Sequence, residues 1–337
     1  MKLLITGAGG FVGARLARQI LARGHLMGQP ITSMVLTDQV PAPADLRSDP
    51  RVQDRTGALL DQCAALRQEP FDGVFHLASA VSGECELDFD LGLRSNLDST
   101  RALLDALRAS GAASGKPARL VFSSSVAVYG PDPSFALPKR VGDETLPAPQ
   151  TSYGVQKLVC EHLITDYTRK GFIDGRAARL VTVTVRPGKP NGAASSFFSG
   201  IIREPLAGLP SVCPVSEQVS HPVASPTNTV RGLIAVFEAS QEAFGGRLAL
   251  VLPALNVRVS EMLDALQEVA GSAIRARVTF ERDERIAGIV ANWPQGAYGA
   301  RAARLGLRPD ESFADIVRQY IADCRADPNA AQALAGM

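Results

Sequence analysis

The sequence lacks several features that mark whole classes of protein. Its 35 basic and 34 acidic side chains nearly balance, so no excess of positive charge indicates binding to nucleic acid or to an anionic membrane surface. No apolar run approaches the roughly 20 residues of a membrane-spanning helix, and no internal repeat or low-complexity tract stands out. We therefore expect a small-molecule ligand, with no nucleic acid and no membrane as partner.

Cysteine is also sparse. The chain has five, an odd number that is widely spread and contains no C-x-x-C pair: Cys63, Cys85, Cys160, Cys213 and Cys324. This pattern indicates neither a disulfide framework nor a zinc site, and we expect no metal. Because a core strand opens the sequence without a targeting segment, we expect a cytoplasmic protein. The 337 residues suffice for one large domain or two smaller ones.

What the sequence does contain is a short apolar strand that runs into closely spaced glycines. Residues 3–5 are apolar without polar alternation, which is typical of a parallel strand buried on both faces. An amphipathic helix begins within the glycines. In a strand–glycine turn–helix unit, the glycines let the backbone approach a pyrophosphate closely, and the helix N-terminus offers free N–H groups to it. The pattern predicts a dinucleotide site, the alternative being a glycine turn without a ligand; its residues are Gly7, Gly10, Phe11, Val12 and Gly13.

A second strand, residues 34–37, ends at Asp38. An acidic side chain there can accept hydrogen bonds from both ribose hydroxyls of the adenosine, and its charge would repel a 2′-phosphate. The expected cofactor is therefore NAD, with NADP less favoured, unless Asp38 merely starts a turn. In the fourth strand His76 precedes the loop at the carboxyl end, and we interpret it as satisfied inside the sheet rather than as an acid or base.

Residues 119–122 form a fifth strand, and three serines follow at 123–125. Further along, Tyr153 and Lys157 lie at i and i+4 on one face of a helix. A phenol with a pKa of about 10 is a poor base at neutral pH. An adjacent ammonium and the positive nicotinamide of an oxidised cofactor would lower that pKa, so the pattern indicates a tyrosine base. The alternative is that Tyr153 and Lys157 are an ordinary pair on the protein surface without a catalytic role.

The rest of the chain alternates between expected strands and helices. Strands are predicted at 180–185, 247–251 and 277–281, and helices at 226–240, 259–269 and 312–326. Trp293 is interpreted as a buried core residue.

Three segments resemble the extended branch of the short-chain dehydrogenase/reductase superfamily. They are T-G-x-x-G-x-x-G at 6–13, S-S-S-x-x-V-Y-G at 123–130 and Y-G-V-Q-K at 153–157, and the resemblance covers at least residues 2–188. It implies that Tyr153 is the catalytic acid/base, that Lys157 lowers its pKa and anchors the nicotinamide ribose, and that Ser125 holds the reacting substrate oxygen. It also implies further cofactor contacts at Ala78, Asn96, Ser123 and Pro187.

The resemblance further implies an α/β fold, with a doubly wound parallel-sheet Rossmann domain at 1–188. A smaller C-terminal α/β substrate lobe is expected at 189–337, with some segments returning to the sheet. The implied reaction is NAD-dependent oxidation of the C2 hydroxyl of a small sugar acid. Substrate contacts are expected at Ser82, Ser125, Asn191 and Arg231, with Arg186 a further candidate for the carboxylate. Helices at 96–108 and 153–169 are expected to form a homodimer interface.

The chain departs from its relatives in two places. They usually place an aspartate after the third strand to hold the adenine amino group, whereas this chain has Ala58. Small neutral residues at 192–200 replace the sugar-nucleotide pattern and suit a small substrate. The rival functions are an NDP-sugar 4-epimerase or dehydratase that retains its NAD, and a non-catalytic dinucleotide-sensing protein. A sensor needs no base, so the joint presence of Ser125, Tyr153 and Lys157 speaks against it.

Overall fold

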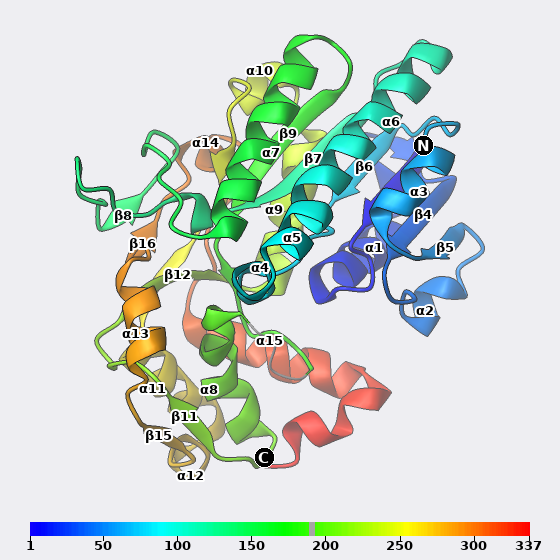
Figure 1. The fold of residues 1–337 in the computed structure, drawn as a ribbon. Coiled ribbons are helices and arrows are strands. Elements are labelled where there is room, and N and C mark those ends of the chain that lie inside the picture. Colours follow the sequence, from blue (N-terminus) through cyan, green and yellow to red (C-terminus); the bar gives the residue numbers. More distant parts are fainter. Residues whose placement is uncertain (189–192) are drawn as a thin grey trace.

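A seven-stranded parallel sheet forms the larger part of the computed structural model, which describes residues 1–188 and 193–337 (Figure 1). Its strands lie in the order β13-β9-β7-β6-β1-β4-β5, and neighbouring strands are parallel. Their bounds are Lys2–Thr6 (β1), Ser33–Asp38 (β4), Val52–Thr56 (β5), Gly73–His76 (β6), Arg119–Ser125 (β7), Asp174–Leu180 (β9) and Leu250–Val251 (β13). The order reverses between β1 and β6, and doubly wound sheets bind ligands at the carboxyl ends of such strands.

The sheet is buried on both faces, which explains its unbroken apolar runs. Leu3 and Ile5 of β1 pack in the core with α1 (Phe11–Arg23) and α9 (Pro226–Glu238), whereas Leu4 packs in the core on the opposite face. That second core is covered by α3 (Leu59–Leu66), α6 (Ser99–Ser114) and α7 (Ser152–Arg169). The predicted fold class, a doubly wound α/β sheet, is confirmed.

A second group of elements lies below the large sheet in Figure 1 and has a hydrophobic core of its own. It contains a three-stranded sheet, β10-β12-β14, formed by Thr182–Val183, Ser220–Ala224 and Leu255–Arg258. The helices on this core include α8 (Phe197–Leu206), α11 (Val259–Ala270), α13 (Glu284–Ala291) and α15 (Phe313–Ala326). Trp293 is partly buried at its margin. Some segments beyond residue 188 complete the large sheet instead, since β13 is its edge strand and α9 covers one face.

Shorter elements connect these parts. The strands are β2 (His25–Leu26) with β3 (Gln29–Pro30), β8 (Arg140–Val141) with β16 (Gly296–Ala297), and β11 (Ser211–Cys213) with β15 (Val278–Phe280). The helices include α2 (Ala44–Arg47), α4 (Ser82–Leu87), α5 (Phe89–Gly92), α10 (Gln241–Phe244), α12 (Ser272–Arg275) and α14 (Ala300–Arg304). None of the helices in the described ranges is long and apolar enough to cross a membrane.

The strand predicted at 180–185 is wrong as placed. The sixth strand of the large sheet is β9, which ends at Leu180, and residues 182–183 belong to the small sheet as β10. The apolar pattern does not show β9 because the strand carries charged residues in ion pairs, namely the buried Arg176 and Arg179 and the partly buried Asp174.

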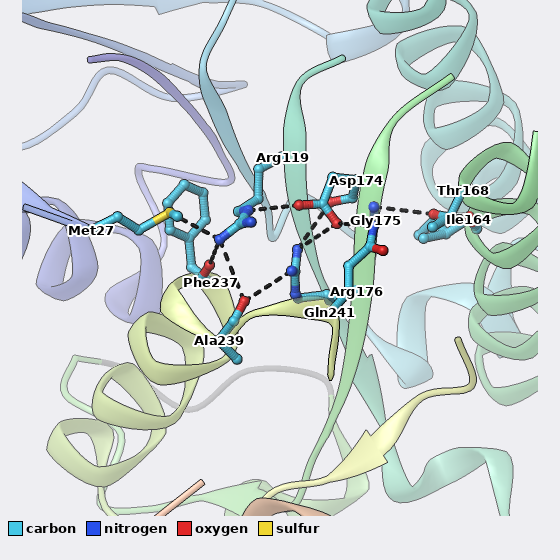
Figure 2. Close-up of polar contacts among 10 residues, drawn as sticks. All are labelled: Met27, Arg119, Ile164, Thr168, Asp174, Gly175, Arg176, Phe237, Ala239 and Gln241. Carbon is cyan, nitrogen blue, oxygen red and sulfur yellow. Dashed lines mark hydrogen bonds and ion pairs between the residues drawn. The ribbon is translucent and has the colours of Figure 1, made fainter. Parts of the chain in front are cut away.

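At the amino ends of β7 and β9, an ion-pair cluster ties the end of α9 to the sheet (Figure 2). Asp174 accepts a hydrogen bond from Arg119 Nε at 2.8 Å and pairs with Arg176 Nη1 at 2.9 Å. The same arginines donate to the carbonyl oxygens of Phe237 and Ala239, each at 2.9 Å. Burial favours a higher pKa for Asp174, but the charge and hydrogen bond of Arg176 outweigh burial and leave this pKa below its usual value.

Candidate active site

The glycine turn between β1 and α1 leaves no room for side chains. Gly7 has a left-handed backbone with a φ of +74°, and a Cβ atom there would lie 2.6 Å from the amide nitrogen of Ala78. A Cβ on Gly13 would lie 2.1 Å from the carbonyl oxygen of Gly7, so α1 packs directly on the turn. The helix begins at Phe11 with Gly10 as its N-cap, without a side-chain cap or an acidic residue in the first turn. Its first N–H groups lack intrahelical acceptors and fit a dinucleotide pyrophosphate.

Asp38 ends β4 beside this turn, as expected for a ribose-binding carboxylate. Its Oδ2 accepts a hydrogen bond from the Gly9 amide at 3.0 Å, and its Oδ1 accepts one from the Gln39 amide at 2.6 Å. The carboxylate is therefore held against the glycine turn and stays partly exposed.

Ala58 is the N-cap of α3 and offers no polar side chain. One turn later, Gln62 accepts a hydrogen bond from the Thr37 hydroxyl at 2.7 Å and donates to the Gly57 carbonyl at 2.9 Å. An amide thus lies at the corner between β4 and α3. Gln62 could not be recognised from the sequence, because a single glutamine within a helix is not part of any motif.

His76 is buried in β6, and both nitrogens of its ring are hydrogen-bonded. Its Nδ1 and Nε2 lie 2.7 and 2.9 Å from the hydroxyl oxygens of Thr6 and Thr100, and burial lowers its pKa to about 3. The Thr6 hydroxyl also accepts a hydrogen bond from the Ala78 amide at 3.2 Å. His76 is therefore neutral and satisfied inside the sheet, as predicted, and helps to position the loop that follows.

Asn96 joins that loop to α7. Its Oδ1 accepts a hydrogen bond from the Ala80 amide at 2.7 Å, and its Nδ2 donates to Oε1 of Gln156 at 2.8 Å. Ser82 begins α4, which packs against α7, and Glu86 of α4 accepts a hydrogen bond from the Ser152 amide at 2.7 Å. Gln156 could not be recognised from the sequence, because a glutamine that is buried on a helix has the same sequence pattern as one that is exposed.

Lys157 connects α7 to the end of β7. The side chain is 2% exposed, its Nζ donates to the carbonyl oxygen of Ser123 at 2.9 Å, and it lies 5.5 Å from the centre of the Tyr153 ring. The Ser123 hydroxyl donates in turn to the His76 carbonyl at 3.2 Å. Burial lowers the pKa of Lys157 to about 8. An ammonium has three donors, of which one is used on Ser123, so Lys157 can also serve ribose hydroxyls.

The start of α7 packs closely on the segment after β7, which brings Ser125 and Tyr153 together. Thr151 caps the helix by accepting from the Gly154 amide at 3.1 Å. A Cβ on Gly154 would lie 2.3 Å from the carbonyl oxygen of Ala127, so only glycine permits this contact. Ser125 Oγ accepts a hydrogen bond from the Ala127 amide at 3.1 Å, which leaves its own proton available for donation.

The lowering of the Tyr153 pKa by Lys157 and an oxidised nicotinamide stays a prediction. Burial raises the pKa of Tyr153 to about 12, and the groups that oppose this rise are the Ser125 side chain and the charge of Arg186. The ammonium of Lys157, which donates to the Ser123 carbonyl, lies 5.5 Å from the centre of the Tyr153 ring.

Arg186 follows the small strand β10. Its Nε donates to the Val183 carbonyl at 3.0 Å, and its Nη2 donates to the Ser195 hydroxyl at 2.9 Å. Pro187, expected near the cofactor, is exposed. Asn191, expected at the substrate, lies outside the described residues.

The hydrogen bonds of the Arg231 guanidinium do not connect it to Ser125, Tyr153 or Lys157. It lies exposed on α9 and donates to Oδ1 of Asn228 at 2.5 Å and to the Arg308 carbonyl at 3.0 Å. These contacts give Arg231 a structural role at the loop before α15.

Comparisons with known proteins agree with this geometry. The family described as "NAD dependent epimerase/dehydratase family" matches residues 3–245. D-erythronate dehydrogenase of Cupriavidus necator is 48% identical, over 96% of this chain and 98% of its own. The Haemophilus influenzae protein of that name is 40% identical, over 95% and 99%. A solved structure named nucleoside-diphosphate-sugar epimerase, from Agrobacterium tumefaciens, has a TM-score of 0.88 at 41% identity and covers 96% of this chain and 94% of its own.

Proposed function

This chain belongs to the NAD-dependent epimerase/dehydratase family, and from that premise we propose that it is a dehydrogenase that oxidises the C2 hydroxyl of D-erythronate with NAD. The observation that carries the proposal is the grouping of Ser125, Tyr153 and Lys157 at the end of β7, in a chain 48% identical to a D-erythronate dehydrogenase. The product is the 2-oxo acid.

Each of the three side chains has its own role in this reaction. The Ser125 hydroxyl holds the C2 oxygen, and Tyr153 takes the proton from it, assisted by the charge of Arg186. Lys157 anchors the nicotinamide ribose through the donors that Ser123 does not use. Bound NAD supplies the hydride acceptor and a positive ring that further favours the phenolate.

The choice of NAD over NADP rests on Asp38. Its carboxylate is held against the glycine turn by the amides of Gly9 and Gln39, in a position to accept from ribose hydroxyls and to repel a 2′-phosphate. Residues 1–188 would bind the cofactor, and the later residues would mainly bind the substrate. Five free, buried cysteines fit a reducing compartment, which supports action in the cytoplasm.

A homodimer is part of the proposal. On α7, Val155 and Val159 are 46% and 38% exposed at i and i+4, and beside them Leu87 and Phe89 are 90% and 59% exposed. An isologous dimer would cover such an apolar patch, whereas a monomer would leave it in water.

The test is a screen of the purified protein with NAD, following the absorbance of the reduced cofactor. D-erythronate should be oxidised, whereas other four-carbon sugar acids should react more slowly. Tyr153→Phe should lower turnover by at least about two orders of magnitude, because it removes the acid/base group, and it should leave NAD affinity unchanged in calorimetry. No reaction with any sugar acid would refute the proposed function.

The same screen includes NDP-sugars, because the Agrobacterium structure is named an epimerase. Interconversion of an NDP-sugar without accumulation of reduced cofactor, by protein that retains its NAD, would establish the rival function instead.

A further inference from the structure

A positive charge without an acidic partner acts on the catalytic phenol. The three fully buried arginines, Arg176, Arg179 and Arg203, pair with carboxylates at 2.9, 2.7 and 2.6 Å. Arg186 is different: in residues 1–188 and 193–337, no carboxylate lies within 4.0 Å of its guanidinium, and residues 189–192 contain no Asp or Glu. Its charge nevertheless acts on Tyr153.

The guanidinium of Arg186 is partly buried against neutral groups. Its hydrogen bonds within the described ranges go to the Val183 carbonyl and the Ser195 hydroxyl, although a guanidinium has five N–H donors. Burial lowers the pKa of Arg186, and the neighbouring positive charge of Arg203 acts in the same direction. A desolvated cation without a counter-ion costs free energy, which an anionic ligand would recover.

A second buried group, His221, lies near this guanidinium, because His221 contacts Thr182 and Arg186 donates to the carbonyl of the adjacent Val183. His221 of β12 is 3% exposed, its Nε2 lies 2.7 Å from the Thr182 hydroxyl, and its Nδ1 has no hydrogen-bond partner among the described residues. The ring stacks on Phe198 at 4.6 Å, with Trp293 at 5.3 Å. Burial and the charge of Arg186 lower the pKa of His221 to about 3, so the ring is neutral. When the Thr182 hydroxyl donates to Nε2, the ring proton lies on Nδ1 and is available for donation.

We propose that Arg186, Ser195 and His221 form the subsite that binds the carboxylate of the substrate. Arg186 supplies the counter-charge, and His221 Nδ1–H and the Ser195 hydroxyl supply neutral donors. This inference rests on the proposed oxidation of a sugar acid, and it explains the position oxidised. C2 is bonded directly to the carboxyl carbon, so a carboxylate held by Arg186 keeps the C2 hydroxyl close to Tyr153.

The test compares two ligands that differ in one group. 3,4-Dihydroxybutanoate has the carboxylate but no C2 hydroxyl to be oxidised, and 1,2,4-butanetriol has a neutral CH₂OH in place of that carboxylate. With saturating NADH, the acid should raise the Tm of the parent protein and the triol should not. Arg186→Gln should weaken binding of the acid by roughly 10- to 100-fold, as for the loss of a charge-assisted hydrogen bond. Arg186→Lys should recover part of the affinity.

Two further variants complete the design. His221→Phe preserves the stacking on Phe198 but removes Nδ1, and it should weaken acid binding less than Arg186→Gln does. Arg231→Gln is the matched control, an arginine whose guanidinium contacts lie away from the subsite, and it should bind the acid like the parent. Should Arg186→Gln fail to fold, His221→Phe and Arg186→Lys carry the test.

The outcomes separate the two proposals. Equal binding of the acid by the parent and the subsite variants, or no preference of the parent for acid over triol, would overturn the carboxylate subsite. If acid binding depends on Arg186 but the parent reduces no NAD with any sugar acid, the subsite stands and the proposed reaction fails.

Discussion

Glu161 and Arg179 form a deeply buried ion pair next to Ser124, with side chains 5% and 6% exposed. The carboxylate accepts from Arg179 Nε at 2.9 Å and from Nη2 at 2.7 Å, and Oε1 also accepts from the Ser124 hydroxyl at 2.5 Å. Burial favours a lower pKa for Arg179, but its hydrogen bonds to Glu161 outweigh burial and hold the pKa above its ordinary value. The Glu161 carboxylate therefore ties two strands to α7, β9 through Arg179 and β7, which carries Ser125, through Ser124.

Glu161→Gln keeps the shape of the side chain and removes its charge. The cation of Arg179 then stays buried without a counter-charge, and breaking one partner of such a pair costs about 3–5 kcal/mol of unfolding free energy. The matched control is Glu268→Gln, which removes one of the two carboxylate partners of Arg318, the other being Asp315; the side chains of Glu268 and Arg318 are 60% and 52% exposed. An exposed pair contributes about 0–1 kcal/mol, so the control should be close to the parent.

The assay is urea denaturation followed by circular dichroism, with the change in midpoint converted through the m-value. The double variant Glu161→Leu with Arg179→Met should regain most of the lost stability, because it leaves no unpaired charge. Equal losses for Glu161→Gln and Glu268→Gln, or no recovery in the double variant, would refute the reasoning. At temperatures where Glu161→Gln is folded, its turnover should fall, because Ser124 lies between the carbonyl that binds Lys157 and the hydroxyl of Ser125.

Three further predictions follow from the same structure. Asp38→Ser should raise the Michaelis constant for NAD and reduce the difference between the Michaelis constants for NAD and NADP in steady-state kinetics. An unchanged preference for NAD over NADP would mean that the ribose is recognised elsewhere. Val155→Glu combined with Val159→Glu should turn the dimer into a monomer in sedimentation, and a parent that is monomeric at micromolar concentration would contradict the proposed interface. Asp174→Asn should cost about 1–3 kcal/mol at neutral pH. Because the folded pKa of Asp174 is depressed, its stabilisation is present above the unfolded pKa and is lost as pH falls through the folded pKa. Denaturation should therefore show a smaller difference from the parent at about pH 3 than at about pH 7.

The parts of the site that could be predicted are those with fixed spacing within one local unit. Gly7 and Gly13 were recognisable because one strand, one turn and one helix impose their spacing. Tyr153 and Lys157 were recognisable because i and i+4 share a helical face. Spacing gives the face and not the direction of a side chain, and so the donation of Lys157 to Ser123 was not foreseen.

The parts that could not be predicted depend on contacts between distant segments. β9 does not read as a buried strand, because Arg176 and Arg179 are buried only after they meet Asp174 and Glu161. His221 has no motif around it, and its role becomes visible only when β12 brings it near Arg186. The sequence pattern could not distinguish Arg186, which follows an expected strand, from Arg231, which lies inside an expected helix, because neither position shows where a guanidinium makes its contacts.

Pairing with a carboxylate distinguishes the buried arginines of the fold from the two cations near Tyr153. Arg176, Arg179 and Arg203 are each neutralised by a carboxylate of the chain, so the fold itself recovers the cost of burying them. Lys157 and Arg186 donate to a carbonyl or to a carbonyl and a hydroxyl, and their charges are left for something outside the chain. Burying a cation without a counter-charge costs free energy. The proposed functions of Lys157 and Arg186 supply the missing partners, a ribose for Lys157 and a carboxylate for Arg186.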